Sequence, residues 1–166
     1  MEEGINVRGT LKGMAVTIRT AFKRPVTVQY PKEHLPLAAR YAGFPVLLWD
    51  DKVDEPACTG CQVCMRYCPT ECITVTMVDN PKFKEGTSKR RKIVGDFQIK
   101  EERCILCSIC VEVCNFDAIR MSDLHEQADQ GRGDLIHTKA DLLREGREYQ
   151  KKMGIVVSSG EGEEEA

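Results

Sequence analysis

Eight of the nine cysteines in this chain fall into two copies of one spacing, Cys-x2-Cys-x2-Cys-x3-Cys. The two copies comprise Cys58, Cys61, Cys64 and Cys68, then Cys104, Cys107, Cys110 and Cys114. A cubane iron–sulfur cluster needs four thiolates, and three of them at intervals of three residues on a turning loop can reach three irons of one cube. This spacing is the signature of a [4Fe–4S] site, and its repetition predicts two clusters.

The fourth cysteine of each run is expected to serve the other cluster. The step of three residues places it on the following helical turn, where it points away from its own cube, as in two-cluster ferredoxins. The predicted ligands of the first cluster are Cys58, Cys61, Cys64 and Cys114. The predicted ligands of the second cluster are Cys68, Cys104, Cys107 and Cys110.

Zinc sites and disulfides explain these cysteines less well. Zinc sites use Cys-x2-Cys pairs with a longer spacer between them. Disulfides need an oxidising compartment, and the opening residues 1–4 show neither the basic nor the apolar region of a secretory signal. The ninth cysteine, Cys72, stands where the second run has Ala118. We expect it to be a small buried apolar side chain, with a spare cluster ligand as the alternative.

Composition sets the outer bounds of the prediction. A length of 166 residues suggests about one domain, and a net charge of −2 predicts no nucleic-acid partner. No apolar run approaches the ~20 residues of a membrane span. The three histidines, His34, His125 and His137, are scattered and expected at surface or capping positions. We therefore predict electron transfer, with no catalytic site on this chain.

The elements around the cysteines form a duplicated unit. Residues 58–74 align with 104–120, matching the four cysteines and one isoleucine. Residues 73–78 and 93–99 have the composition of strands and predict a hairpin. The basic run 89–92 is expected to be a solvated hairpin tip, although it could meet an acidic partner. The expected fold class is α+β, with a ferredoxin-like double [4Fe–4S] core.

Both ends of the chain carry helical patterns outside this core. At the N-terminus an apolar stripe with helical spacing lies among basic residues, which predicts an amphipathic helix on a membrane or partner surface. The stripe consists of Leu11, Met14, Ala15, Ile18 and Phe22. Near the C-terminus, Thr138 and Asp141 resemble a capping box that begins a helical extension. An ordinary helix packed on its own domain is the alternative for the N-terminal stripe.

Four segments are therefore expected along the chain. They are an N-terminal docking arm with the amphipathic helix (1–50), a two-cluster domain (51–122), a C-terminal docking extension (123–157) and a disordered acidic tail (158–166).

The segments that flank the cysteine runs carry a family resemblance. They are residues 11–17, 25–31, 40–43 and 135–139, with the two runs between the third and the fourth. In this order they resemble the two-cluster ferredoxin-like subunit of NADH:quinone oxidoreductase, respiratory complex I, called subunit I in bacteria. The resemblance covers nearly all of residues 4–154, whereas the cysteines alone indicate only a ferredoxin.

This resemblance implies a place in a larger assembly. It implies a peripheral-arm subunit that relays single electrons through two [4Fe–4S] clusters toward a terminal cluster and quinone, with proton translocation and the quinone site on other subunits. It also implies a peripheral membrane protein on the cytoplasmic face of a prokaryotic plasma membrane. The alternatives are a soluble diffusible ferredoxin, the equivalent subunit of a related membrane-bound hydrogenase or photosynthetic complex, and a scaffold with structural clusters.

The second cysteine run departs from the pattern of this family. Relatives usually carry Gly and Pro where this chain has Ser108 and Asn115. Neither change removes a predicted ligand, but both add groups that can donate hydrogen bonds. Because hydrogen bonds to cluster sulfur stabilise the reduced state, we expect these residues to influence the cluster potentials.

Overall fold

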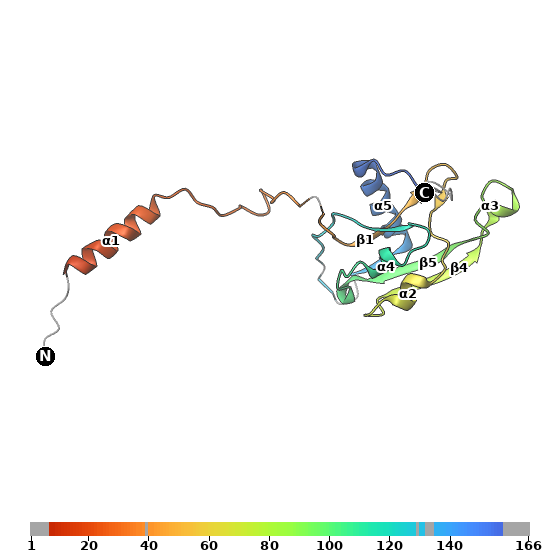
Figure 1. The fold of residues 1–166 in the computed structure, drawn as a ribbon, viewed down its shortest axis with the longest axis horizontal. Helices are drawn as coiled ribbons and strands as arrows, with labels where there is room; N and C mark the ends of the chain where they lie inside the picture. The colour runs from red at the N-terminus through yellow and green to blue at the C-terminus, as the bar shows by residue number, and fades with distance from the viewer. Residues whose placement is uncertain (1–6, 39, 129, 132–134, 158–166) are drawn as a thin grey trace, which may run out of the picture. The chain divides into compact units, whose positions relative to one another are not determined.

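The computed structural model describes residues 7–38, 40–128, 130–131 and 135–157 (Figure 1). The chain divides into two compact units, Met1–Pro36 and Leu37–Ala166. The predicted acidic tail, residues 158–166, lies outside the described residues. The two units are described separately below.

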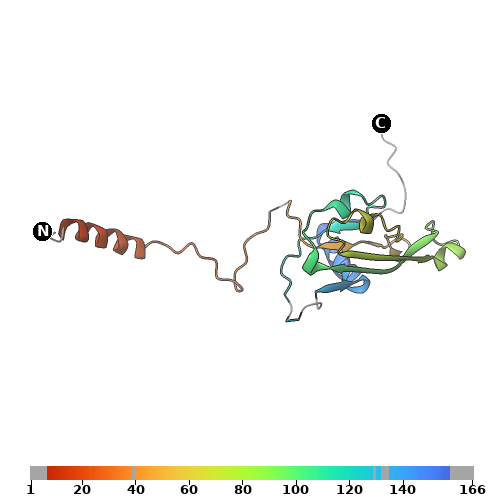
Figure 2. The same cartoon turned by 90° about the horizontal axis from the view of Figure 1, so that it is seen from below.

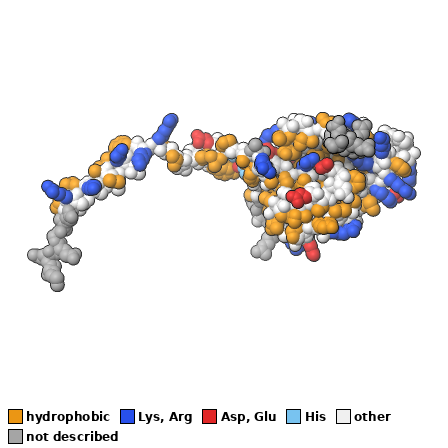
Figure 3. Space-filling model, in the orientation of Figure 1, with side chains coloured by type: hydrophobic (Ala, Val, Ile, Leu, Met, Phe, Trp, Pro, Cys, Tyr) orange, Lys and Arg blue, Asp and Glu red, His pale blue; other side chains and the backbone are white. Residues whose placement is uncertain are grey.

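The first unit contains helix α1 (Val7–Ala21). Its predicted apolar stripe is exposed, with Leu11 at 61%, Met14 at 55% and Ile18 at 56%. The helix ends just before Phe22, whose N–H still donates to the Ile18 carbonyl at 3.3 Å. Figure 3 shows apolar side chains together with Lys and Arg side chains on this helix. Among the described helices, none is long and apolar enough to cross a bilayer.

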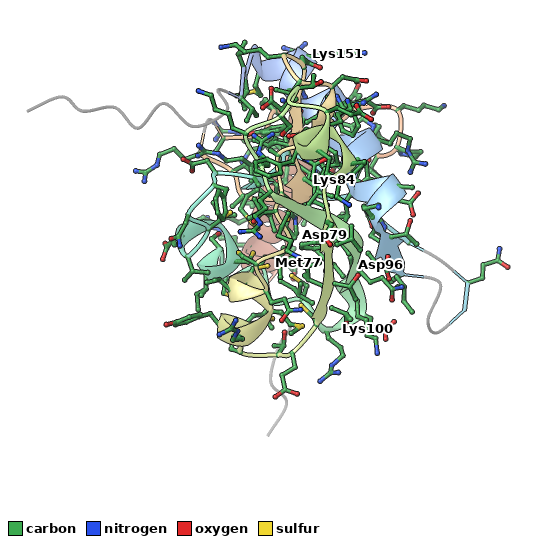
Figure 4. All side chains as sticks on the ribbon, turned by 90° about the vertical axis from the view of Figure 1, so that its right-hand side faces the viewer. Met77, Asp79, Lys84, Asp96, Lys100 and Lys151 are labelled. Atoms are coloured by element: carbon green, nitrogen blue, oxygen red, sulfur yellow. The ribbon has the colours of Figure 1, made fainter. Side chains whose placement is uncertain are left out.

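The second unit contains a three-stranded antiparallel sheet in the order β4-β5-β7. Strands β4 (Ile73–Asp79) and β5 (Lys92–Lys100) form the predicted hairpin, with the short helix α3 (Pro81–Lys84) at its turn. Strand β7 (Ile136–Thr138) pairs with the far end of β5. Figure 4 shows this hairpin with labelled side chains from β4, Met77 and Asp79, and from β5, Asp96 and Lys100.

Two short strand pairs complete the β structure of this unit. Strand β1 (Pro45–Leu47) pairs with β6 (Ile119–Met121), and β2 (Trp49–Asp50) pairs with β3 (Glu55–Pro56). Residues 46–48 are at most 1% exposed. The sequence suggested a boundary after residue 50, but the compact units divide after Pro36. The reason is that the apolar segment 45–50 forms strands β1 and β2 of the second unit.

Helix α5 (Lys139–Met153) covers β1 and begins at the predicted capping box. Asp141 Oδ2 accepts from the Thr138 hydroxyl at 2.7 Å and from the Thr138 N–H at 3.3 Å. The approach to β1 requires a glycine, since a Cβ on Gly146 would lie 1.8 Å from the Leu47 carbonyl oxygen. Gln150 ties the helix to Trp49 by bonding both its N–H and its carbonyl, at 2.8 and 2.9 Å.

A buried ion pair corrects the prediction for the basic run 89–92. Arg90 is not part of a solvated tip, because its side chain is 13% exposed and bonds two buried carboxylates. Its guanidinium lies 2.9 Å from Asp50 and 2.9 Å from Glu55. These partners lie about 35 to 40 residues earlier, so the local charge pattern could not identify them. Arg90 therefore joins the hairpin to β2 and β3.

Candidate functional site: two four-cysteine pockets

Each cysteine run passes from a loop into a short helix and then into a strand. The first run contains α2 (Val63–Tyr67) and leads to β4, and the second contains α4 (Ile109–Glu112) and leads to β6. In each run the third cysteine lies within the helix and the fourth follows its end. Helices α2 and α4 contact each other (Figure 2), which brings the two runs together.

The backbone of the two runs adopts left-handed φ values at matching positions. The pairs, first run and then second, are Gly60 and Leu106 (74° and 54°), Gln62 and Ser108 (64° and 63°), and Glu71 and Asp117 (50° and 46°). Positive φ is uncommon for residues other than glycine, so its recurrence shows that the duplication extends to the backbone. Glycine stands in the first pair because a Cβ on Gly60 would lie 3.0 Å from the Thr76 carbonyl oxygen.

The structure gathers the eight predicted ligands around two pockets. The first pocket is lined by Cys58, Cys61, Cys64 and Cys114, and the second by Cys68, Cys104, Cys107 and Cys110. Each pocket thus receives three cysteines from one run and the fourth from the other. In the described ranges, no three His, Cys, Asp or Glu side chains converge on a point that a single metal ion could occupy. A cubane cluster holds its thiolates on separate irons.

Several of the pocket thiols have a raised pKa and resist ionisation in the absence of a cation. Burial raises the pKa of Cys58 to about 11 and the pKa of Cys64 to about 12, and neighbouring cysteines add to both shifts. Burial likewise raises the pKa of Cys110 to about 12. Metals bind the thiolate form, so these side chains would lose their protons beside a positively charged iron centre. Four thiols in an otherwise largely apolar pocket are a donor set that fits a [4Fe–4S] cluster.

The first pocket also contains a buried hydroxyl that lacks a partner. Thr59 Oγ1 lines this pocket and makes no hydrogen bond within the part of the chain that the structure describes. The sulfur atoms of a bound cluster would accept a hydrogen bond from it. This orphan donor is a second observation that the first pocket fits a cluster.

Cys68 has a different environment from the other pocket cysteines. Its Sγ lies 3.5 Å from Thr70 Oγ1 and 3.4 Å from Cys72 Sγ. Burial raises the pKa of Cys68, but the hydrogen bonds with Thr70 and Cys72 outweigh burial and bring the pKa down to about 7. Cys72 is buried, at 3% exposure, as predicted for a small apolar residue. Its polar contact with Cys68 was not predicted, although the contrast with Ala118 in the second run could have suggested it.

One histidine differs from its prediction, while His34 and His125 are exposed as expected. The His137 side chain is 15% exposed, and its Nδ1 lies 3.3 Å from Glu101 Oε1 and 3.4 Å from Glu145 Oε2. Burial raises the pKa of Glu101 to about 8, and the Glu145 carboxylate adds to the shift. These side chains come from the 3-10 helix η1 (Glu101–Arg103), β7 and α5, so no local pattern could predict the group.

Comparison with protein families identifies the cysteine-rich region. Residues 57–152 match the family model described as a 4Fe-4S double cluster binding domain. The match includes all eight predicted ligands and continues through most of α5. The predictions of two [4Fe–4S] clusters and of an α+β ferredoxin-like core are therefore confirmed.

Curated relatives match most of the length of this chain. The chain is 33% identical to NADH-quinone oxidoreductase subunit I 2 of Symbiobacterium thermophilum over 87% of this chain and 58% of that protein. It is 37% identical to the subunit of the same name from Streptomyces coelicolor over 82% of this chain and 68% of that protein. Among solved structures, a chain of the membrane-bound sulfane sulfur reductase, an archaeal respiratory membrane complex, is similar with 26% identity and a TM-score of 0.47, covering 70% of this chain and 54% of that one.

Proposed function

This chain belongs to the NADH-quinone oxidoreductase subunit I family, and from that premise we propose that it is the electron-relay subunit of a membrane-associated oxidoreductase complex. The observation that carries the proposal is the pair of four-cysteine pockets formed by two contacting runs. Two redox centres held close together in one small domain suit the passage of electrons from one partner to the next.

The pocket residues would hold and insulate the clusters. We assign the first cluster to the four cysteines of the first pocket and the second cluster to Cys68, Cys104, Cys107 and Cys110 of the second pocket, which is the crosswise ligation expected from the spacing. Each bound cluster supplies one-electron redox chemistry. Leu47, Phe97 and Ile119 line the first pocket and are at most 2% exposed, so they keep water from its inner wall.

Helix α1 is assigned the role of attachment to the assembly. Its exposed apolar residues and basic residues suit a surface formed by anionic lipid headgroups or by a partner subunit at the membrane. The chain would then lie on the cytoplasmic face of the membrane as a peripheral subunit. NADH, quinone and any proton translocation would belong to partner chains, and this chain would have no independent catalytic site.

A fractionation experiment in the native host tests this assignment. The wild-type chain, a Leu11→Gln/Ile18→Gln variant and a Thr17→Gln/Thr20→Gln control would each be followed into membrane and soluble fractions. The control changes the same helix, but the hydroxyls of Thr17 and Thr20 donate to backbone carbonyls of α1 itself. Electron paramagnetic resonance of the reduced protein would report both clusters in every fraction.

We expect the wild type and the control to sediment with membranes in a large detergent-extractable assembly. The apolar-stripe variant should appear in the supernatant with both cluster signals intact, because it loses only the attachment surface. A wild-type chain that stays monomeric and soluble would indicate a diffusible ferredoxin and overturn the proposal. Clusters that cannot be reduced reversibly would indicate a structural role and also overturn it.

A further inference from the structure

Two side chains outside the predicted ligand set surround the sulfur of Cys68. The Thr70 hydroxyl oxygen and the Cys72 sulfur lie 3.5 and 3.4 Å from it. Both residues belong to the turn between α2 and β4, and both line the second pocket together with Cys68. The second pocket therefore contains five cysteines, of which four are assigned as ligands.

Ligation would fix the direction of these hydrogen bonds. A cysteine sulfur bound to iron carries no proton, so Cys68 Sγ can only accept. The Thr70 hydroxyl and the Cys72 thiol must then be the donors. Burial of Cys72 among apolar residues favours its neutral, protonated form.

The second repeat provides a matched site without these donors. The residues at the corresponding positions after Cys114 are Phe116 and Ala118. Neither side chain can donate a hydrogen bond. The two crossing cysteines, Cys68 and Cys114, thus differ in the side chains that follow them, although their runs share spacing and backbone conformation.

Backbone donors, by contrast, occur in both sites. The Gly60 N–H donates to Cys58 Sγ at 3.4 Å in the first run. The backbone of Leu106 makes the corresponding hydrogen bond to Cys104 in the second run. The hydrogen bonds that these N–H groups donate to cysteine sulfur are therefore repeated in both runs. The side-chain hydrogen bonds of Thr70 and Cys72 occur at one site.

We propose that Thr70 and Cys72 raise the reduction potential of the second cluster by donating hydrogen bonds to its ligand sulfur. This inference rests on the proposed function, because it takes Cys68 as a ligand of that cluster. Reduction adds one electron and increases the negative charge shared by the cluster and its thiolates. A donor at the sulfur stabilises the more negative form, so both residues act through Cys68 as positioning residues and do not contact iron.

The test is a redox titration of the purified full chain, with the electron paramagnetic resonance of each cluster as the readout. The variants are Thr70→Val, Cys72→Ala and the double substitution, with iron and sulfide content measured to verify two clusters. Each single variant should lower the equilibrium constant for reduction of the second cluster about threefold. The double variant should lower it about tenfold, which corresponds to ~59 mV for one electron. The first cluster should keep its potential.

Two further variants separate hydrogen bonding from general disturbance of the turn. Cys72→Ser retains a donor and should keep the potential near the wild-type value. The reciprocal variant Phe116→Thr/Ala118→Cys introduces both donors beside Cys114 and should raise the potential of the first cluster alone. Electron–nuclear double resonance in H2O and D2O should detect exchangeable protons coupled to the reduced second cluster, and the double variant should show fewer of them than the wild type, because only the protons of Thr70 and Cys72 are removed.

An unchanged second potential in the double variant, with both clusters present, would overturn the inference. A shift confined to the first cluster would overturn it as well, because Cys68 would then serve the other site. The proposed function would fail differently, since the wild-type chain itself would then lack two reversible one-electron steps.

Discussion

The two cluster-binding repeats share a backbone and differ in what surrounds it. Glu55 lies three residues before Cys58, and Glu101 lies three residues before Cys104. Both glutamates are buried, at 2% and 5% exposure. The pKa of Glu55 is nevertheless lowered, whereas the pKa of Glu101 is raised to about 8. Duplication therefore preserved the position of the carboxyl group but not its charge.

The surroundings of Glu55 stabilise a carboxylate. Burial raises its pKa, but hydrogen bonds from Ser88 at 2.6 Å, from Asn80 at 2.9 Å and from Arg90 at 2.9 Å together outweigh burial. All three donors come from the turn of the β4–β5 hairpin. The long hairpin between the two cysteine runs thus supplies the polar partners of the first repeat.

The surroundings of Glu101 favour the protonated acid. Burial is the main cause, and the nearby Glu145 carboxylate increases it. The described groups that face this carboxyl are His137 from β7 and Glu145 from α5, and Arg144 pairs with Glu145 at 3.6 Å. Each repeat has therefore adapted to the segment that covers it, the hairpin turn in one case and the C-terminal helix in the other.

The largest effect that can distinguish the repeats comes from the crossing cysteines. Cys114→Ala should abolish or strongly perturb the cluster that we assign to Cys58, Cys61 and Cys64, although Cys114 belongs to the other run, because the structure places it in the first pocket. The loss of the first cluster is measured by spectroscopy that resolves the two reduced clusters, together with iron analysis. Cys72→Ala is the control and should retain both clusters. Damage restricted to the second cluster would contradict crosswise ligation.

The next largest effect concerns Glu55. Glu55→Gln removes a carboxylate from Arg90, and loss of one partner of a buried ion pair costs about 3 kcal/mol of unfolding free energy. The contribution of Glu55 is present above its unfolded pKa of 4.5 and is lost as the pH falls through its lowered folded pKa. Denaturant unfolding of the cluster-loaded chain near neutral pH measures the difference in unfolding free energy between Glu55→Gln and the wild type. Equal stability of the variant and the wild type would show that Asp50 alone suffices for Arg90.

The comparison also shows what the sequence could predict. Cysteine spacing, the alternating strands 73–78 and 93–99 and the Thr138 capping box are local patterns, and each predicted its element correctly. The same spacing predicted which four cysteines share a pocket, although ligation itself stays a prediction.

Long-range partners could not be predicted in this way. Arg90 meets Asp50 and Glu55 only after the hairpin has folded over β2 and β3, and His137 meets Glu101 only after β7 pairs with β5. A local pattern gives the periodicity of a segment but not which distant segment it meets. For that reason the sequence predicted a solvated Arg90, which was wrong, and a surface or capping position for His137, whereas its side chain is 15% exposed and lies beside Glu101.

A smaller effect should appear in the pH dependence of Glu101. Because its folded pKa of about 8 exceeds the unfolded value of 4.5, the folded state binds the proton more tightly. Its stabilising contribution is full below pH 4.5 and is lost as the pH rises through about 8. We expect wild-type stability to fall by roughly 2 kcal/mol across this range from this group.

Glu101→Gln tests that dependence because it mimics the neutral acid at every pH. The variant should match the wild type in mildly acidic buffer and exceed it in mildly alkaline buffer. The measurement is the temperature at which cluster absorbance is lost, compared between the variant and the wild type at each pH. The difference between the two temperatures removes the acid sensitivity of the clusters, because both proteins share it. A difference that does not change with pH would mean that Glu101 is ionised in the folded chain.

The smallest difference between the repeats is expected from Ser108. Ser108 and Gln62 occupy the same left-handed position, and each lines the pocket of its own run. The Gln62 side chain donates to the Val75 carbonyl at 3.3 Å. We expect the Ser108 hydroxyl to be a further donor for the second cluster, so Ser108→Gly should lower the equilibrium constant for reduction about twofold. Protein-film voltammetry measures this shift, and Ser108→Ala separates the loss of the hydroxyl from the relief of backbone strain. Asn115→Pro is the counterpart for the first cluster, because Asn115 follows Cys114, which is the crossing ligand that we propose for that cluster. If neither potential moves while both clusters are retained, the departures at Ser108 and Asn115 do not act on cluster sulfur.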